Sequence, residues 1–375
     1  MILFGFIRCV GTLFWLLGLT PYLYRFRDMQ QRIHIATTTD NVQLAWARSG
    51  SGPTLVKASN WMTHLREDVD SPVWGHWIRF LSSHFDFVRF DERGCGLSDR
   101  QVDDVSERHW LGDLECVVDA AAIARPMTLL GISQGAAATI QYAIAHPERV
   151  SKLILYGGYS RGGLVRGGRH AEHYRALLEM VRLGWGNQNP MFRQVFTARF
   201  VPEGSHEQVD WFNELCRRTV APEMAMRLLE ARASTDISDL LPQVRVPTLV
   251  LHARNDEVIP VAEGRRLASA IPGAEFVELD SRNHVLLSHE PAWLDFQRAV
   301  REFTGVAREE ARPAGESPLT AREQRVLALL REGKTNAQIA AEAFISEKTV
   351  RNHLSSVYRK LGVNSRAQAI VKVQS

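Results

Sequence analysis

Hydrophobic and polar positions follow two alternating periods along most of the chain. Short aliphatic and aromatic runs have the length of strands, and amphipathic stretches of helical length separate them. This alternation favours a mostly parallel, doubly wound α/β sheet. The first two runs flank a short polar turn and predict an antiparallel pair. The predicted strands are Arg32–Ile35, Val42–Trp46, Thr54–Ala58, Phe85–Phe90, the apolar run before Gly131, Val150–Tyr156, Val246–His252 and Glu275–Asp280.

The strand rhythm stops between about residues 160 and 240. This region begins rich in glycine and arginine and continues with amphipathic segments of helical length. We therefore expect a helical lid over the carboxyl edge of the sheet, inside an α/β domain that spans residues 29–305. The predicted lid helices are Ala171–Leu183, Met191–Phe200, His206–Thr219 and Pro222–Ala233, and the sheet's own helices are Trp74–Ser83, Ser106–Ala122, the one after Gly135, and Pro291–Phe303.

A different pattern fills residues 318–375, where short helices follow one another. Thr320 and Glu323 form a capping box for the first helix, Thr335 caps the second and Ser346 caps the third. In the third helix one buried stripe is predicted, made of Val350, Leu354, Val357 and Leu361. The opposite face is polar and basic, and it carries Lys348, Thr349, Arg351, Asn352, Ser355 and Arg359.

Two segments fall outside these domains. Residues 306–317 are charged, small and proline-containing, which is typical of a flexible linker. Residues 1–28 are strongly apolar but lack a clear cleavage site, and their apolar run is shorter than the roughly 20 residues of a membrane span. They are either a weak membrane anchor, which Arg25 and Arg27 would orient with the following chain in the cytoplasm, or a start codon assigned too early.

Composition and charge sharpen this two-domain picture. With 375 residues and 45% hydrophobic residues, the chain can bury a large core. From residue 318 onward the chain has ten Lys or Arg and four Glu, which gives this tail a formal charge of +6. The whole chain has a formal net charge of +3, so the residues before 318 carry −3. A basic tail indicates a polyanion partner. The four cysteines show no CxxC or metal-ligand spacing, which favours a reducing compartment and no metal or other cofactor.

The segment Gly131-Ile-Ser-Gln-Gly135 joins a predicted strand to a predicted helix through a sharp turn. In that context Ser133 is a candidate nucleophile. A serine needs a base and an orienting carboxylate, and His284 and Asp256 follow later strands in the order Ser, Asp, His. Each residue also has a simpler interpretation: a glycine-rich turn, a helix cap and a packing histidine. The three together at successive strand ends favour a catalytic triad.

Over about residues 30–305 the chain resembles the α/β-hydrolase superfamily, on these motifs and on Asp91-Glu-Arg-Gly-Cys-Gly-Leu-Ser98. The resemblance implies that Ser133, Asp256 and His284 catalyse hydrolysis of an ester, lactone or amide, and that the 91–98 loop supports the site. It also implies an oxyanion site from the backbone amides of Gln134 and Trp61. Where the family commonly has His-Gly, this chain has Ser59-Asn60, which leaves slow turnover or binding without turnover open.

The tail resembles the LuxR-type helix-turn-helix, on Leu319-Thr-Ala-Arg-Glu323, Lys334–Ala340, Ile345–His353 and Lys360–Val363. The resemblance implies that Glu347–Lys360 is the recognition helix, which places its polar face in the major groove of double-stranded DNA. It also implies that Arg366–Val373 joins two copies into a homodimer. Without the resemblance, a small bundle with a solvated face is the alternative.

The sequence therefore predicts a cytoplasmic transcriptional regulator, either free or tethered to a membrane at its N-terminus, whose hydrolase-like domain binds or hydrolyses a small molecule. The alternative is a serine hydrolase in which DNA binding is secondary. A scaffold protein would leave both Ser133 and the basic helix unexplained. The lid carries no motif that identifies the ligand.

Overall fold

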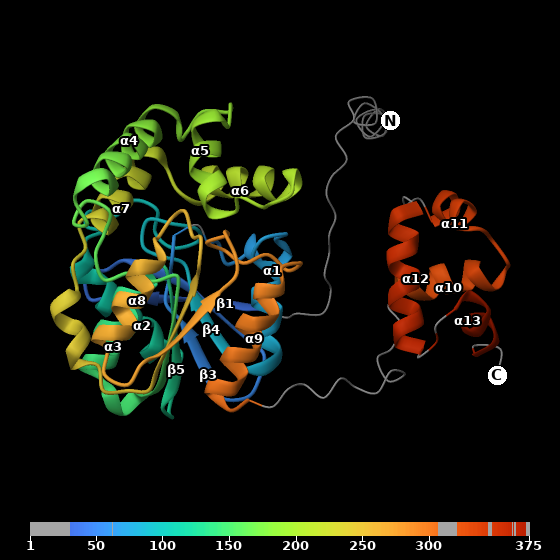
Figure 1. The fold of residues 1–375 in the computed structure, drawn as a ribbon, viewed down its shortest axis with the longest axis horizontal. Coiled ribbons are helices and arrows are strands. Elements are labelled where there is room, and N and C mark those ends of the chain that lie inside the picture. Colours follow the sequence, from blue (N-terminus) through green and yellow to red (C-terminus); the bar gives the residue numbers. More distant parts are fainter. Residues whose placement is uncertain are drawn as a thin grey trace, which may run out of the picture. The chain divides into compact units, whose positions relative to one another are not determined.

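The computed structural model describes residues 31–61, 63–306, 321–343, 347–361, 363 and 365–372 (Figure 1). The chain divides into two compact units, Met1–Thr304 and Gly305–Ser375. The described part of the first unit contains an eight-stranded sheet in the order β1-β2-β4-β3-β5-β6-β7-β8. The strands are β1 Arg32–Thr37, β2 Gln43–Ser49, β3 Thr54–Lys57, β4 Asp86–Phe90, β5 Met127–Ile132, β6 Val150–Tyr156, β7 Thr248–Ala253 and β8 Glu275–Leu279.

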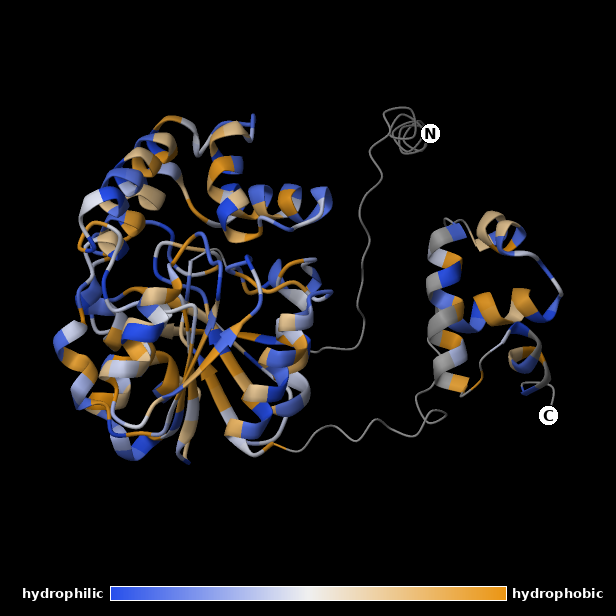
Figure 2. Cartoon of the chain, in the orientation of Figure 1, coloured by the Kyte–Doolittle hydropathy of each residue, from blue (hydrophilic) through white to orange (hydrophobic). Residues whose placement is uncertain are grey.

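The pairing confirms the predicted mostly parallel sheet. β1 and β2 are antiparallel, with His34 opposite Trp46, and β2 also runs antiparallel to β4. From β4 to β8 every neighbouring pair is parallel. The central strands β5 and β7 are buried at every position, because helices cover both faces of the sheet. Figure 2 shows hydrophobic residues gathered on these strands.

Helices form the outer layers of the sheet. Figure 1 shows α1 and α9 on one side of the strands and α2, α3 and α8 on the other. All except α8 were predicted; α8 was missed because Gly264 and two arginines interrupt its hydrophobic pattern. These helices are α1 Gly75–His84, α2 Trp110–Ala120, α3 Gly135–Ala145, α8 Val261–Ala270 and α9 Pro291–Thr304, with 3-10 turns at Asp68–Asp70, Glu107–His109, Pro147–Arg149 and Ser238–Gln243.

The region between β6 and β7 forms the predicted helices. A capping box at Ser205 and Gln208 begins α6, and Pro222 occupies the first turn of α7, where its missing N–H costs nothing. The helices are α4 Gly168–Gly184, α5 Met191–Phe200, α6 His206–Thr219 and α7 Pro222–Ala233.

An aromatic cluster fixes α1 and α9 against the sheet. The ring centroid of Trp77 lies 4.6 Å from Phe296, 4.8 Å from Trp293 and 5.1 Å from Tyr156. Trp77 Nε1 donates a hydrogen bond of 3.0 Å to the carbonyl oxygen of Leu286, and His76 Nε2 lies 2.9 Å from the same oxygen. The cluster therefore also holds the loop after β8, which carries His284.

The second unit has a small hydrophobic core of its own. Its helices are α10 Ala321–Arg331, α11 Asn336–Ala343, α12 Glu347–Leu361 and α13 Arg366–Lys372. Val350, Leu354 and Val357 are buried in the core, with Leu361 packed against it, so the predicted stripe is confirmed. The predicted cap at Thr335 is also confirmed, because Thr335 Oγ1 accepts from the backbone N–H of Gln338 at 3.3 Å.

Some predictions concern the N-terminal segment, the linker and two helix caps. Among the described residues, no helix has the length and apolar character needed to cross a membrane. The N-terminal segment, the linker, and the caps at Thr320 and Ser346 lie outside the described residues.

The position of His76 generates a prediction for stability against pH. Burial lowers the pKa of His76 from 6.5 to about 4, so the folded state keeps the imidazole neutral where the unfolded state binds a proton. Its contribution to stability is complete above about pH 6.5 and is lost as the pH falls toward 4. Between pH 7 and pH 5 we expect wild type to lose about 2 kcal/mol more stability than His76→Gln.

The measurement is urea unfolding followed by tryptophan fluorescence. No tryptophan follows Trp293 in the sequence, so the signal reports only the first unit. Equal losses in wild type and His76→Gln between the two pH values would show that His76 does not carry this dependence.

Candidate active site and candidate nucleic-acid interface

Ser133 lies on a strained turn between β5 and α3. Its φ of +53° is in the left-handed region, which residues other than glycine seldom adopt. A Cβ on Gly131 would lie 2.4 Å from Thr139 Oγ1, and one on Gly135 would lie 2.9 Å from the Ser59 carbonyl oxygen. Both glycines are therefore required by close approach of the chain, as the motif predicts. The turn presents Ser133, which is partly exposed, at the carboxyl end of the sheet.

The structure brings His284 and Asp256 together. His284 Nδ1 lies 2.6 Å from Asp256 Oδ2, and both side chains are buried. Asp256 Oδ1 accepts from the backbone N–H groups of Val258 and Ile259 at 2.8 and 2.9 Å, which fixes the carboxylate. A carboxylate at Nδ1 holds the imidazole in one orientation and leaves Nε2 as the nitrogen that can take a proton.

The third member of the predicted triad makes no direct contact. No hydrogen bond joins Ser133 Oγ to His284 Nε2, which is buried and without a partner in the described part of the chain. The two residues flank Gly157 and Gly158: a Cβ on Gly157 would lie 3.1 Å from His284 Cε1, and one on Gly158 would lie 3.7 Å from the Ser133 carbonyl oxygen. Catalytic hydrogen bonds are often long before substrate binds, so this geometry is compatible with a resting site.

The predicted oxyanion amides are available. Within the described residues, the backbone N–H groups of Gln134 and Trp61 donate to no acceptor. Gln134 precedes the first turn of α3, where the helix dipole favours negative charge. Local hydrogen bonds fix the Ser59-Asn60 segment, which replaces the His-Gly common in the family. Asn60 Nδ2 donates to the Trp61 carbonyl oxygen at 3.1 Å, and Thr63 Oγ1 donates to the Asn60 carbonyl oxygen at 3.1 Å.

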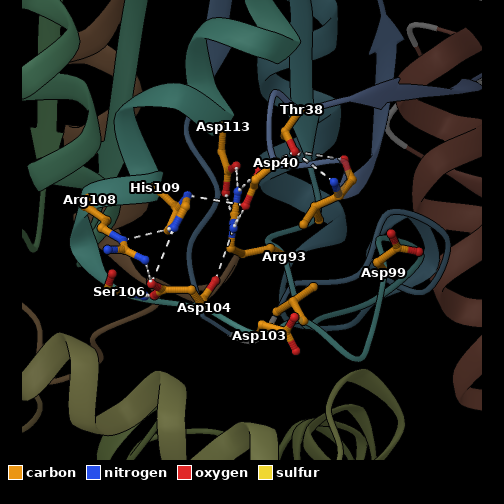
Figure 3. A network of polar contacts seen from close by, with 12 residues as sticks. Thr38, Asp40, Arg93, Asp99, Asp103, Asp104, Ser106, Arg108, His109 and Asp113 are labelled. Atoms are coloured by element: carbon orange, nitrogen blue, oxygen red, sulfur yellow. Dashed lines mark hydrogen bonds and ion pairs between the residues drawn. The ribbon is translucent and has the colours of Figure 1, made fainter.

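The loop 91–98 braces this region, as its resemblance implied. Asp91 carboxylate oxygens accept from the N–H groups of Leu65 and Leu97 at 3.0 and 2.9 Å, which ties the segment after Trp61 to the end of β4. Figure 3 shows Arg93 between Asp113 and Asp40. Arg93 Nε donates to Asp113 Oδ2 at 2.7 Å, and Arg93 Nη1 donates to Asp40 Oδ2 at 2.8 Å. The Arg93 guanidinium holds the pKa of Asp40 well below its usual value. Asp91 and Arg93 therefore anchor the first residues of the loop.

A cavity of about 50 Å³ opens at Ser133. Lid side chains from α4, α5 and α7 line it together with Trp61 and Gln134. Sequence reasoning missed its arginines, Arg166, Arg199 and Arg232, which lie far apart in the sequence and converge only in the fold. The one available signal was the glycine- and arginine-rich start of the lid region.

The described residues offer neither a reactive thiol at Cys95 nor a metal-binding cluster. Burial raises the pKa of the Cys95 thiol well above its ordinary value, so this thiol is not nucleophilic near neutral pH. No group of three His, Cys, Asp or Glu residues gathers to hold a metal ion within the described ranges.

The candidate DNA-reading helix is α12. Arg351 is exposed and lies 3.8 Å from Glu347, one turn earlier, while Thr349 is partly buried. The side chains of Lys348, Asn352, Ser355 and Arg359 lie outside the described residues, although their backbone is part of α12. The buried stripe of α12 faces the core of the second unit, while Arg351 is exposed.

Comparisons with protein families identify both units. Residues 78–292 match the family described as serine aminopeptidase, S33, and cover more than half of the chain. Residues 317–373 match the family described as bacterial regulatory proteins, luxR family. The predicted pairing of an α/β-hydrolase domain with a LuxR-type helix-turn-helix is confirmed.

Individual proteins agree with this division. The chain is 23% identical over 263 residues to a pyrrolizixenacetamide deacetylase of Xenorhabdus hominickii, covering 70% of this chain and 95% of the relative. It is 56% identical over 55 residues to the spore germination protein GerE of Bacillus subtilis, covering 15% of this chain and 74% of the relative. An esterase of Exiguobacterium antarcticum shares the fold, with a TM-score of 0.62, 21% identity, and coverage of 72% and 98%.

The contact between Gly157 and His284 generates a prediction. In Gly157→Ala the added methyl meets the His284 ring at 3.1 Å, and both this residue and Gly273 have positive φ. Gly273→Ala is therefore a matched control, because it carries the same kind of backbone strain with nothing within 4 Å. We expect similar losses in Tm, but a roughly tenfold to hundredfold slower reaction of Ser133 with a phosphonate probe only in Gly157→Ala. Equal reaction rates in the two variants would contradict a role for the His284 position.

Proposed function

Because the chain belongs to the α/β-hydrolase family described as serine aminopeptidase, S33, we propose that Ser133 attacks the carbonyl carbon of a small ester, lactone or amide in this DNA-binding transcriptional regulator. The observation that carries the proposal is the buried pair of His284 Nδ1 and Asp256 Oδ2 at 2.6 Å beside the strained turn of Ser133. The deacetylase and esterase relatives support acyl transfer as the reaction class.

The proposed reaction has two halves. Ser133 Oγ forms a bond to the carbonyl carbon while its proton moves to His284 Nε2, and the amides of Gln134 and Trp61 stabilise the oxyanion. The leaving alcohol or amine departs with the proton from His284. Water then attacks the acyl-serine, again losing its proton to His284, and releases the acid and free Ser133. Asp256 stays ionised and orients the imidazole throughout.

Binding without turnover is the second candidate. The absent hydrogen bond between Ser133 Oγ and His284 Nε2, and the Ser59-Asn60 departure, favour it. A regulator needs only a ligand that binds two states of the protein unequally, because DNA affinity and ligand affinity then change by the same factor.

The tail supplies the DNA-binding output. We propose that the face of α12 with Lys348, Thr349, Arg351, Asn352, Ser355 and Arg359 enters the major groove, with the first residues at base edges and the others at phosphates. We further propose that α13 joins two copies, so that the protein occupies the two halves of a palindromic site.

A serine-reactive phosphonate tests the catalytic proposal. The probe is expected to label wild type at a single residue and to leave Ser133→Ala unlabelled. His284→Gln is expected to react at least about a hundredfold more slowly, because the general base is lost. Peptide mapping by mass spectrometry identifies the labelled residue, and unchanged Tm values show that the variants fold. An unlabelled wild type would remove the catalytic proposal and leave binding without turnover.

Arg351→Ala tests the DNA interface, with Arg331→Ala as a control for the loss of one exposed positive charge on α10. Arg351→Ala is expected to weaken binding roughly tenfold or to lower the slope of log K against log salt by about one, whereas Arg331→Ala changes neither. Binding is measured by fluorescence anisotropy on a palindromic operator over a salt series, with stoichiometry from sedimentation. Equal effects of both variants would sink the assignment of α12, and one chain per operator would sink the dimer.

A further inference from the structure

The cavity at Ser133 is positively charged. Arg166 comes from the loop before α4, Arg199 from α5 and Arg232 from α7, and all three line the cavity. Among the described residues that line it, none is an aspartate or a glutamate. Arginine keeps its charge at any pH a folded protein meets, so the cavity offers fixed positive charge.

Arg166 is the least neutralised of the three. In the described part of the chain its guanidinium makes no hydrogen bond or ion pair, and Nε and Nη1 are buried without an acceptor. Burial also lowers the pKa of Arg166, the direction expected for a desolvated cation. Buried guanidinium N–H groups that lack acceptors are costly, and a ligand that supplies acceptors would relieve this cost.

Arg232 and Arg199 place further guanidinium groups at the same cavity, with the charge of Arg232 offset by Glu92. Arg232 is 4% exposed, pairs with Glu92 through Nη2, and lies 4.5 Å above the ring centroid of Trp61. This fixed position leaves Nε and Nη1 of Arg232 buried without acceptors. Arg199 donates from Nε and Nη2 to the Glu257 carbonyl oxygen at 3.1 and 2.7 Å, which satisfies donors without cancelling the charge.

We propose that the ligand of this site carries a carboxylate, bound by the guanidinium groups of Arg166 and Arg232, with its reactive carbonyl at Ser133. A guanidinium matches the planar carboxylate through two parallel hydrogen bonds. Apolar walls from Trp61 and Phe196 accommodate a short carbon chain. The position of the reactive carbonyl rests on the proposed function; the anion site itself does not.

Two esters of nearly equal size test the substrate class on the full chain. Monoethyl succinate carries the carboxylate, and ethyl butanoate has a methyl group in its place. Wild type is expected to favour monoethyl succinate, and Arg166→Gln to lower its kcat/KM roughly tenfold to hundredfold while lowering that of ethyl butanoate much less. Arg166→Lys keeps the charge, and its kcat/KM for monoethyl succinate is expected to lie between those of wild type and Arg166→Gln. Arg169→Gln is the matched control, because Arg169 is exposed and its loss changes net charge equally.

Binding of succinate to Ser133→Ala, measured by calorimetry, separates the two proposals. Succinate is expected to bind, to bind at least tenfold more weakly when Arg166→Gln is added, and to bind more tightly than neutral succinamide. If wild type hydrolyses neither ester while succinate binds in this way, the result supports the anion site and contradicts the proposed hydrolysis. If both esters are hydrolysed equally well and succinate does not bind, the anion site is wrong. Tighter binding of inorganic phosphate than of succinate would overturn the carboxylate assignment.

Discussion

The hydrolase unit depends on close approach of backbone segments at the carboxyl ends of β5 and β6. Gly131 and Gly135 remove the side chains that would otherwise meet Thr139 and Ser59, and this clearance permits the sharp turn at Ser133. Gly157 then admits the His284 ring from the other side. Since a β-carbon does not fit at Gly131 or Gly135, close backbone packing sets the position of Ser133.

Around this crossing, buried polar groups hold the loops that carry function. Asp91 ties the segment after Trp61 to β4, and the Trp77 cluster ties the segment after His284 to α1 and α9. The lid contributes as well, because the N–H of His284 donates to the Phe200 carbonyl oxygen at 2.9 Å. In a low-dielectric interior such bonds are worth more than at the surface, and leaving one partner alone is costly. At the cavity, Arg166 and Arg232 keep buried N–H groups without acceptors, and a ligand with oxygen acceptors would satisfy them.

The second unit follows simpler physics. Its core consists of apolar stripes on short helices, and α12 contributes the buried stripe of Val350, Leu354 and Val357 while Arg351 is exposed. Electrostatic attraction to phosphates needs only exposed Lys and Arg, whereas base reading needs the helix to fit the groove. The formal charge of +6 from residue 318 onward serves the first requirement, and helix geometry serves the second.

The sequence by itself determined the strands, most of the helices, the order of Ser133, Asp256 and His284, and the helix-turn-helix. These features depend on local periodicity or on motifs whose spacing is written in the chain. It did not determine α8, whose face is interrupted, or which lid residues reach the cavity. Arg166, Arg199 and Arg232 carry no shared motif, because their meeting depends on how α4, α5 and α7 pack over the sheet. Only the tertiary structure brought these three arginines to one cavity, where they form a candidate anion site.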